Sequence, residues 1–306
     1  MKKLLYLVFL ISIISCNTNN KKKTLEATKE TKPTWNALWN GKDFAGWNIY
    51  LGNRFNEKED SLGNPIEPYG LNNDPLEVIT VVEHDNENVI KITGEAFGMI
   101  FTKKDYKNYH LKLKVKWGKQ KFRPRDNAPR DSGLLYHGFG APGSAYDWMS
   151  SQELQIQEGD MGDYWAIGDV EIDVPSVPHK DIYHIYKEGA DLRTYYFAEV
   201  VRHATAEDSL AKRRVFKALN AEKSHGEWND IELITLGDQS IHIVNGKVVM
   251  RLYNSRVGSN QKPLSKTIEN IKPLTSGRII LQSEGAELYY KDIYIKEITE
   301  IPEQFK

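Results

Sequence analysis

The chain has a single cysteine, Cys16, among its 306 residues, and this scarcity excludes several kinds of protein. Without a second cysteine it can form neither an internal disulfide nor a cysteine-based metal site, so its stability must come from an apolar core. The metal-binding pattern His-Glu-x-x-His is also missing. The net charge is −1 with no sustained basic patch, which argues against a nucleic-acid partner.

Long apolar runs are absent after the first residues, so no later segment is predicted to cross a membrane as a helix. The start of the chain is basic, residues 4–14 are apolar, and the small Ser15 precedes Cys16. This order predicts a signal peptide over residues 1–15. The following polar residues predict a flexible tether over residues 16–33.

The run Ile13-Ile14-Ser15-Cys16 resembles the lipobox of bacterial lipoproteins. The resemblance implies a lipid attached to Cys16 and a membrane anchor, and the alternative is a plain signal peptide with an incidental cysteine. Asn17 and Thr18 lack the Asp that is typical of inner-membrane retention. An exported protein anchored in the outer membrane, on its periplasmic or cell-surface face, is therefore expected.

Helical periodicity is not sustained anywhere, whereas period-two alternation recurs and predicts an all-β fold of antiparallel strands. The run from His110 to Lys116 alternates strictly, which is typical of a strand with one face in water. Asn245-Gly246 is the signal of a two-residue hairpin. One sandwich domain is expected over residues 34–300. Strands are predicted at residues 77–82, 89–93, 99–102, 110–116, 133–136, 153–157, 194–200, 228–235, 240–244, 247–252, 278–282 and 287–295.

The segment from Asp160 to Leu192 is long and only weakly periodic, so it is predicted to be an insertion that borders a functional site. Within it Asp169, Glu171 and Asp173 alternate with apolar residues. We expect this acidic row to be the solvent-facing side of a strand.

The most informative stretch runs from Ser151 to Asp160. Alternation places Glu153, Gln155 and Gln157 together on one face of a strand, because successive side chains point to opposite sides. One carboxylate and two amides form a floor with both donors and acceptors for hydrogen bonds. Such a floor suits a polar, neutral ligand, and a carbohydrate is the first expectation.

Eight motifs follow one another along nearly the whole predicted domain, at Trp39–Trp47, Gly98–Tyr106, Asp131–Leu134, Glu153–Ile156, Gly226–Asn229, Val244–Gly246, Leu281–Gly285 and Tyr290–Ile293. In this order they resemble one family, the domain once called DUF1080 and now the 3-keto-disaccharide hydrolase or 3-keto-glucoside lyase/hydratase family. The resemblance implies a concanavalin-like jelly-roll sandwich and action on 3-oxo sugars.

The predicted strand from Glu153 to Gln157 argues against ordinary glycoside hydrolysis, which uses two carboxylates beside the scissile bond. Jelly-roll glycosidases that resemble laminarinases carry Glu-x-Asp-x-Glu on one strand, whereas the chain has Glu153, Gln155 and Gln157. In the 3-oxo sugar that the resemblance implies, the ketone at C3 acidifies the hydrogen on C2. A single base can then remove that proton and start a β-elimination of the aglycone from C1. We expect Glu153 to be this base or a metal ligand, with Gln155 orienting hydroxyls, and the alternative is a purely structural Glu153.

Further candidates have both functional and structural interpretations. His137 could act as acid or base or as a metal ligand, or lie on the surface, and Glu284 is a second acid candidate. Glu158 and Asp160 could hold a divalent metal ion, the one cofactor that the sequence allows, or form an ordinary charged turn. Tyr164 and Trp165 could stack on a sugar or pack in the core. Arg130 and Gln157 are candidates for binding substrate.

Two functional classes remain open. The first is a carbohydrate-active enzyme that cleaves 3-keto-glycosides, supplied by a partner sugar 3-oxidoreductase. The second is a non-catalytic, carbohydrate-binding surface lipoprotein that uses the same sheet, since a fold alone does not establish catalysis.

Overall fold

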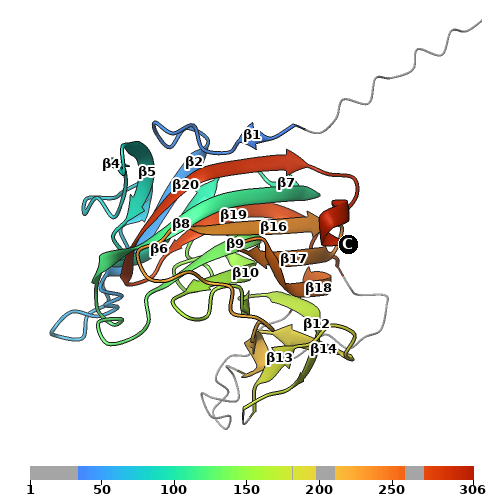
Figure 1. Ribbon diagram of the computed structural model, residues 1–306. Coiled ribbons are helices and arrows are strands. Elements are labelled where there is room, and N and C mark those ends of the chain that lie inside the picture. The colour runs from blue at the N-terminus through green and yellow to red at the C-terminus, as the bar shows by residue number, and fades with distance from the viewer. Residues whose placement is uncertain (1–33, 181, 198–210, 259–271) are drawn as a thin grey trace, which may run out of the picture. The chain divides into compact units, whose positions relative to one another are not determined.

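The computed structural model describes residues 34–180, 182–197, 211–258 and 272–306. The described chain consists mainly of β-strands in two large antiparallel sheets, with a short 3-10 helix, η2 (Glu303–Phe305), near its end (Figure 1). The predicted jelly-roll sandwich is therefore confirmed. The predicted signal peptide at residues 1–15 and the tether at residues 16–33, with Cys16, lie outside the described residues.

The first sheet has eleven strands among the described residues, in the order β13-β12-β18-β17-β16-β8-β20-β5-β4, with β1 beside β20 and β14 beside β12. Its strands are β1 (Asn36–Ala37), β4 (Ile79–His84), β5 (Glu87–Ile92), β8 (Tyr109–Lys121), β12 (Val170–Pro178), β13 (His184–Tyr186), β14 (Leu192–Tyr196), β16 (Asn229–Leu236), β17 (Gln239–Val244), β18 (Lys247–Val257) and β20 (Ala286–Glu297).

The second sheet has nine described strands, in the order β15-β11-β10-β9-β19-β6-β2-β3, with β7 beside β19. Its strands are β2 (Trp47–Arg54), β3 (Gly70–Leu71), β6 (Ala96–Thr102), β7 (Tyr106–Lys107), β9 (Asp131–Phe139), β10 (Ser150–Gln157), β11 (Tyr164–Ile167), β15 (Arg214–Val215) and β19 (Ser276–Ser283).

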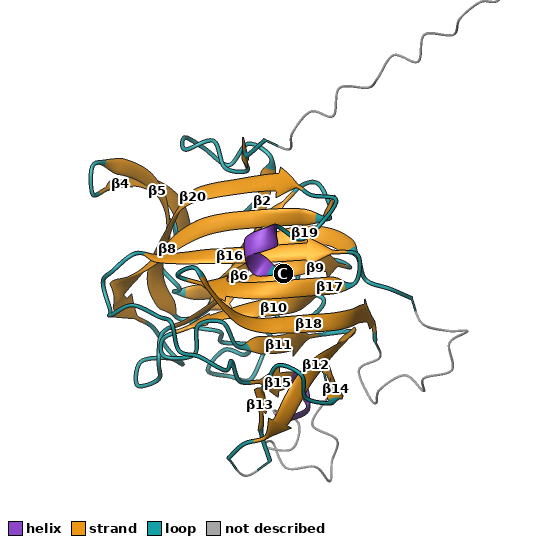
Figure 2. Ribbon diagram, turned by 45° about the vertical axis from the view of Figure 1, so that its right-hand side comes forward, coloured by secondary structure: helices purple, strands orange, loops and turns teal. Residues whose placement is uncertain are grey.

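Strand β8 shows how the alternation builds the first sheet, seen in Figure 2. Leu111 and Leu113 are buried in the core between the sheets, whereas the intervening lysines point outward. On the outer face Lys112 lies opposite Glu232 of β16, and their charged atoms are 3.3 Å apart. The predicted wet face is thus the outer face of the sandwich, where cross-strand charges of opposite sign meet.

The second sheet has two unlike faces. Leu134 of β9 and Leu154 of β10 belong to the core that the two sheets share. Leu135 and Ile280 point the other way and join a separate apolar cluster. Because strand side chains alternate, the residues next to the core leucines line the face that turns away from the first sheet. This outer face carries the candidate site.

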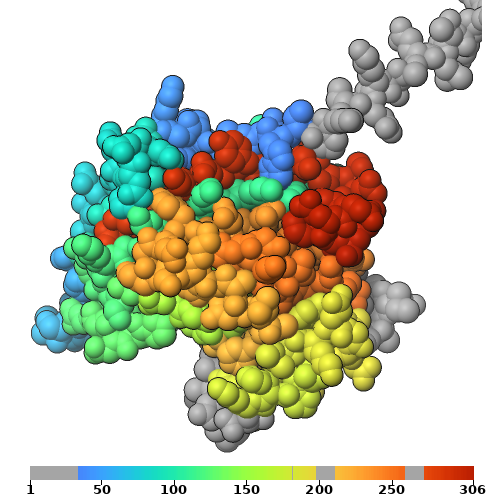
Figure 3. All heavy atoms as spheres, viewed as in Figure 1, coloured from blue at the N-terminus to red at the C-terminus, as the bar shows by residue number. Residues whose placement is uncertain are grey.

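The segment from Asp160 to Leu192 is richer in structure than expected, because it contains β11, β12 and β13. The predicted strand through Glu171 and Asp173 exists, but its solvent-facing acidic side is wrong. Glu171 and Asp173 are buried, and they bind Arg256 of β18 at 2.9 and 3.1 Å. Strands β12, β13 and β14 form part of a lobe at the edge of the sandwich (Figures 1 and 3).

The predicted strands all overlap strands of the structure, although residues 198–200 of one prediction lie outside the described part. The alternation misses β2, whose pairing with β6 is irregular between Leu51 and Arg54. Among the described residues no helix is long and apolar enough to cross a membrane.

The predicted hairpin at Asn245-Gly246 joins β17 to β18, and both residues have positive φ, at 49° and 74°. The Asn245 amide also anchors a neighbouring loop. Its Nδ2 donates to the Ala221 carbonyl and to Asn229 Oδ1, both at 2.8 Å, and its Oδ1 accepts from the Asp230 N–H at 2.8 Å. The turn therefore connects three segments near one end of the sandwich.

We expect Asn245→Ala to lower the free energy of unfolding by about 2–4 kcal/mol, because it removes three hydrogen bonds and forces alanine into a left-handed conformation. Asn245→Gly keeps the turn and should lose less. Chemical denaturation measures both, with the exposed Lys247→Ala as control. Equal losses for the Ala and Gly variants would show that the conformation of residue 245 is unimportant.

Candidate functional site

A cavity of about 520 Å³ opens on the outer face of the second sheet. Strands β9, β10 and β19 supply its polar floor, and loop residues supply its walls. A mixed polar and aromatic cavity of this size suits a small polar ligand. The lining residues are Asn56, Lys58, Phe97, Arg125, Asp131, Tyr146, Asp147, Trp148, Glu153, Gln155, Gln157, Trp165, Ile167, Arg213, Arg214, Gln282 and Glu284.

Strand register brings three carboxylates into this cavity. Gln157 pairs with Asp131 across β10 and β9, and Asp131 pairs with Glu284 just beyond β19. Glu153 lies on β10 with its side chain on the same face as Gln157, and it pairs with Leu135. The predicted one-faced row of Glu153, Gln155 and Gln157 therefore exists, and neighbouring strands add two acids to it.

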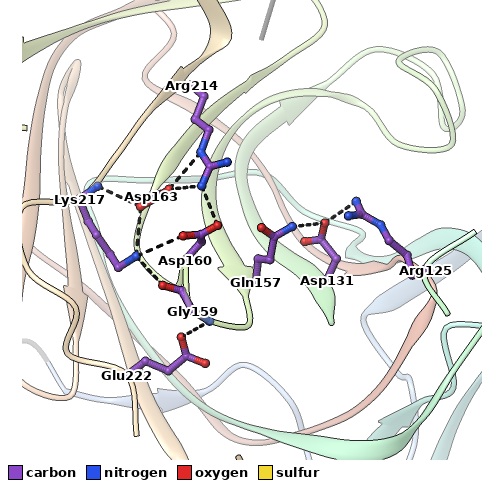
Figure 4. A network of polar contacts seen from close by, with 9 residues as sticks. All are labelled: Arg125, Asp131, Gln157, Gly159, Asp160, Asp163, Arg214, Lys217 and Glu222. Carbon is purple, nitrogen blue, oxygen red and sulfur yellow. Dashed lines mark hydrogen bonds and ion pairs between the residues drawn. The ribbon is translucent and has the colours of Figure 1, made fainter. Parts of the chain in front are cut away.

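Arg125 holds the two added carboxylates. Its guanidinium forms ion pairs with both Asp131 and Glu284. Gln157 Nε2 also donates to Asp131 Oδ2 at 2.7 Å, so the amide, the acid and the arginine form a chain of contacts (Figure 4). A carboxylate bound to arginine is held in place by charge-assisted hydrogen bonds. Arg125 thus holds both Asp131 and Glu284 in place, although burial still raises the pKa of each.

Glu153 differs from both. Its side chain is only 3% exposed, and it makes no hydrogen bond or ion pair with any residue in the described ranges. Burial and the nearby charges of Glu284 and Asp131 raise the pKa of Glu153 well above its ordinary value. A buried carboxyl without a partner inside the protein is costly to retain. Such a group is often part of a functional site.

Gly133 makes room for Glu153. It lies opposite Gln155 in the sheet and has no positive φ, so its backbone does not require glycine. A Cβ at this position would lie 2.1 Å from Glu153 Oε1 and 2.6 Å from Gln282 Oε1. The carboxyl of Glu153 therefore occupies the space that a side chain at position 133 would fill.

Several polar atoms around Glu153 lack a partner among the described residues. They are Asp131 Oδ1, Gln155 Oε1, Gln282 Oε1, Trp165 Nε1 and Arg213 Nε, and each is a buried atom of a residue that lines the cavity. Buried polar groups are usually hydrogen-bonded. Their concentration around one cavity indicates a site built to bind a polar ligand.

The aromatic candidates separate. Trp165 lines the cavity, whereas Tyr164 is fully buried in the core and donates its hydroxyl to Gln152 Oε1 at 2.5 Å. Adjacent residues of a strand face opposite sides, so the two cannot form one platform. Trp165 is thus a residue of the cavity and pairs with Glu153 across β10 and β11, whereas Tyr164 packs in the core.

His137 is not brought to the cavity. It is buried at the end of β9, packs against Tyr109 and Tyr136, and does not line the cavity. Burial lowers the pKa of His137 to about 4, so it is neutral near neutral pH. A position among core side chains does not suit the acid, base or metal-ligand roles considered for it.

The candidates for a metal ion bind cations instead. Glu158 lies 3.0 Å from Arg130, and Asp160 lies 2.7 Å from Arg214 in the cluster of Figure 4. No group of three or more His, Cys, Asp or Glu side chains in the described part of the chain is arranged to hold a metal ion. Arg130 also donates to the Gly118 and Lys119 carbonyls and does not line the cavity.

Sequence reasoning overlooked Asp131 and Gln282 as site residues. Gln282 and Glu284 alternate with Ser283, and Asp131 alternates with Ser132 ahead of Gly133, so the period-two pattern marks one face of each strand. The pattern could have placed these acids and amides on one face. Arg125 lies in a loop, where alternation gives no signal.

We expect Gly133→Ala to cost about 1–3 kcal/mol of folding free energy, because the added Cβ collides with Glu153. In a Glu153→Ala background the same change should cost at least 1 kcal/mol less, measured as a coupling energy by denaturant unfolding. Gly277→Ala is the control. Its Cβ would meet the His137 backbone at 2.4 Å and not Glu153, so its cost should be the same in both backgrounds. Equal costs in both backgrounds would show that Glu153 does not occupy the space.

Ionised Glu153 should destabilise the fold. Its folded pKa is raised, so its contribution is favourable below the unfolded pKa and is lost as pH rises through the folded pKa. We therefore expect Glu153→Gln to raise the free energy of unfolding by more than about 1 kcal/mol at pH 8, and by less at pH 5. Denaturant unfolding at both pH values measures this. A variant that is less stable at pH 8 would indicate a structural role.

Jelly-roll topology with a buried acid, amides and an indole on one open sheet defines a protein with a site for a small polar ligand. The 3-keto-alpha-glucoside-1,2-lyase-like domain family matches residues 34–296, and the chain belongs to this family. It is thus a carbohydrate-active protein with a 3-keto-glucoside lyase-like domain. The expected family is confirmed.

Solved structures similar to the chain include two proteins from Parabacteroides distasonis provisionally assigned as glycosyl hydrolases. One is 20% identical, with 86% of this chain and 94% of that chain covered and a TM-score of 0.46. The other is 19% identical, with 73% and 95% covered and a TM-score of 0.40. A carbohydrate-binding module from Bacillus subtilis is 8% identical, with 70% and 89% covered and a TM-score of 0.36. No curated protein matches the chain.

Proposed function

We propose that the protein cleaves 3-keto-glycosides by β-elimination, with Glu153 as the base. The observation that carries this proposal is the state of the four cavity carboxylates, of which Asp147 is paired with Lys58. Asp131 and Glu284 are both bound to Arg125, whereas Glu153 is buried and free of any partner in the described residues. One free acid suits a reaction that needs one base.

The reaction starts at C2 of a 3-oxo sugar. The Glu153 carboxylate takes the C2 proton, and the electron pair of that bond forms an enolate with the C3 oxygen. The enolate then re-forms the C3 ketone, a double bond forms between C1 and C2, and the bond from C1 to the aglycone oxygen breaks. The proton passes to the aglycone, giving an enone and an alcohol. Water can later add to the enone.

The raised pKa of Glu153 fits this role. A carboxylate with a higher pKa is a stronger base, and catalysis is most effective when the pKa lies near the working pH. The two acids on Arg125 fit a conventional glycosidase less well, because hydrolysis needs one acid to donate a proton and another to attack or activate water. Gln155 and Gln157 line the same floor, where their amides can orient sugar hydroxyls.

The other expectations complete the proposal. The ketone must come from an oxidoreductase that oxidises C3 of a glycoside, because elimination neither supplies nor consumes electrons. Export and a lipid anchor at Cys16 in the outer membrane would place the protein where such glycosides arrive. A divalent ion is assigned no step, because Glu158 and Asp160 already bind arginines.

We expect Glu153→Gln to lower kcat/KM for a 3-keto-glucoside by about 10²–10⁴-fold, the usual contribution of a positioned base. Formation of the enone, followed by its absorbance, and release of the aglycone measure this. Glu158→Gln is the matched control, since it removes a carboxylate of the same segment outside the cavity and should change the rate by less than about threefold.

Three outcomes would contradict the proposal or part of it. Wild-type protein that binds the 3-keto-glucoside without turnover would establish the binding-protein alternative. Full activity of Glu153→Gln would exclude Glu153 as the base. Loss of activity after dialysis against a chelator, restored by a divalent ion, would show that a metal takes part.

A further inference from the structure

Four cationic side chains line the cavity, and three of them are bound to carboxylates. Arg213 is the fourth, and it forms no ion pair with a carboxylate among the described residues. The bound pairs are Lys58 with Asp147, Arg125 with Asp131 and Glu284, and Arg214 with Asp160 and Asp163. Once these pairs are set aside, one anion and one cation of the cavity have no oppositely charged partner in the described part of the chain: Glu153 and Arg213.

Trp165 lies between these two groups. It pairs in register with Glu153 on one side and with Arg214, the neighbour of Arg213, on the other. The guanidinium carbon of Arg213 lies 5.0 Å from the centroid of the Trp165 ring. Arg213 Nη1 is also 3.5 Å from the Tyr146 hydroxyl oxygen. Stacking on an indole holds an arginine in place while leaving its N–H groups available.

One N–H donor of each side chain has no acceptor in the described chain. Arg213 Nε and Trp165 Nε1 are both buried and unpartnered. Arginine and tryptophan side chains can donate hydrogen bonds but cannot accept them. Such a pair matches an oxygen atom that carries no hydrogen and has or gains negative charge. A sugar hydroxyl is a poorer match, because its own hydrogen then needs a separate acceptor.

We propose that Arg213, supported by Trp165, binds the C3 ketone oxygen of the substrate and stabilises the enolate formed from it. This assignment rests on the proposed function. As Glu153 removes the C2 proton, negative charge gathers on the C3 oxygen, two bonds away. A fixed guanidinium beside that oxygen is strengthened by each increment of charge, so it stabilises the transition state more than the ground state.

The same residue acts on the base. The positive charge of Arg213, together with that of Arg125, lowers the pKa of Glu153 against the opposing effects of burial, Glu284 and Asp131. Removing the charge at position 213 should therefore raise the pKa of Glu153 further. The acid limb of the pH–rate profile, on which activity rises as Glu153 loses its proton, should move to higher pH.

The first test measures binding without turnover. In the Glu153→Gln background, calorimetry compares methyl 3-oxo-glucoside with methyl glucoside, using both anomers. We expect the ketone to bind at least about tenfold more tightly, and Arg213→Gln to abolish that preference while leaving the affinity for methyl glucoside within about threefold. No preference for the ketone, or a preference that survives Arg213→Gln, would overturn the assignment.

The second test measures catalysis with Glu153 present. We expect Arg213→Gln to lower kcat by about 10²–10³-fold, the usual loss on removing a donor to a developing oxyanion, with a smaller change in KM. Arg213→Lys keeps the charge and should recover part of the rate. Arg123→Gln is the control, because Arg123 carries the same charge in a loop outside the cavity.

The outcomes separate this inference from the proposed function. If the wild-type protein does not cleave the 3-keto-glucoside, the proposed function fails. If it does and Arg213→Gln cleaves at the same rate with an unchanged acid limb, only the role of Arg213 fails. Circular dichroism and thermal unfolding establish that each variant is folded, and a poorly folded Arg213→Gln is replaced by Arg213→Met in both tests.

Discussion

The alternation of side chains across the second sheet is the constraint on which the whole site depends. One face of β9 and β10 must be apolar, because Leu134 and Leu154 complete the core beneath the first sheet. The other face is then free of that requirement and can carry acids and amides. Register does the rest, because antiparallel pairing places Gln157, Asp131 and Glu284 in one row without any loop having to fold around them. A site built on strands in this way is more rigid than one built on loops.

Rigidity allows the cavity to hold charges that would otherwise be unfavourable. Three carboxyls gather on one floor, and burial raises the pKa of each of them. A single guanidinium, that of Arg125, serves two of the acids, so the third is left with an unbalanced charge when it ionises. The protein thereby concentrates electrostatic strain on Glu153 instead of spreading it over the site. Sites that perform chemistry often show this combination of a stable frame and one unsatisfied group.

Much of the frame could be predicted from the sequence, because alternation reports which strands have a buried face. The strands around His110, Glu153 and Tyr290 were all located in this way. The pattern was less informative where both faces are covered: Glu171 and Asp173 look like a wet row, yet Arg256 from a strand far along the chain buries them. Sequence spacing contains no information about such a distant partner.

The site residues that lie on regular strands could also be predicted from the alternation. Glu153, Gln155, Gln157 and Trp165 lie where strand periodicity puts them, on the cavity face. The assignments that failed to reach the cavity depended on single residues at strand ends or in turns. The backbone at His137 has a φ of 54°, which departs from strand geometry, so the alternation cannot be carried through it. Arg125 and Arg213 reach the cavity from outside the strands, and only the three-dimensional arrangement shows that Arg125 binds two acids while Arg213 stacks on Trp165.

Gly133 has a consequence for how this scaffold can change. The hydrogen at its α-carbon marks a place in the sheet where a methyl group and the carboxyl of Glu153 compete for the same volume. Nothing in the backbone there calls for glycine, so the side chains around this position, Glu153 foremost, are what restrict it. A larger side chain at this position would have to displace the carboxyl of Glu153, the group to which the proposed catalysis is assigned. On the proposed function, one small residue of β9 would then keep the space in which the base of the reaction lies.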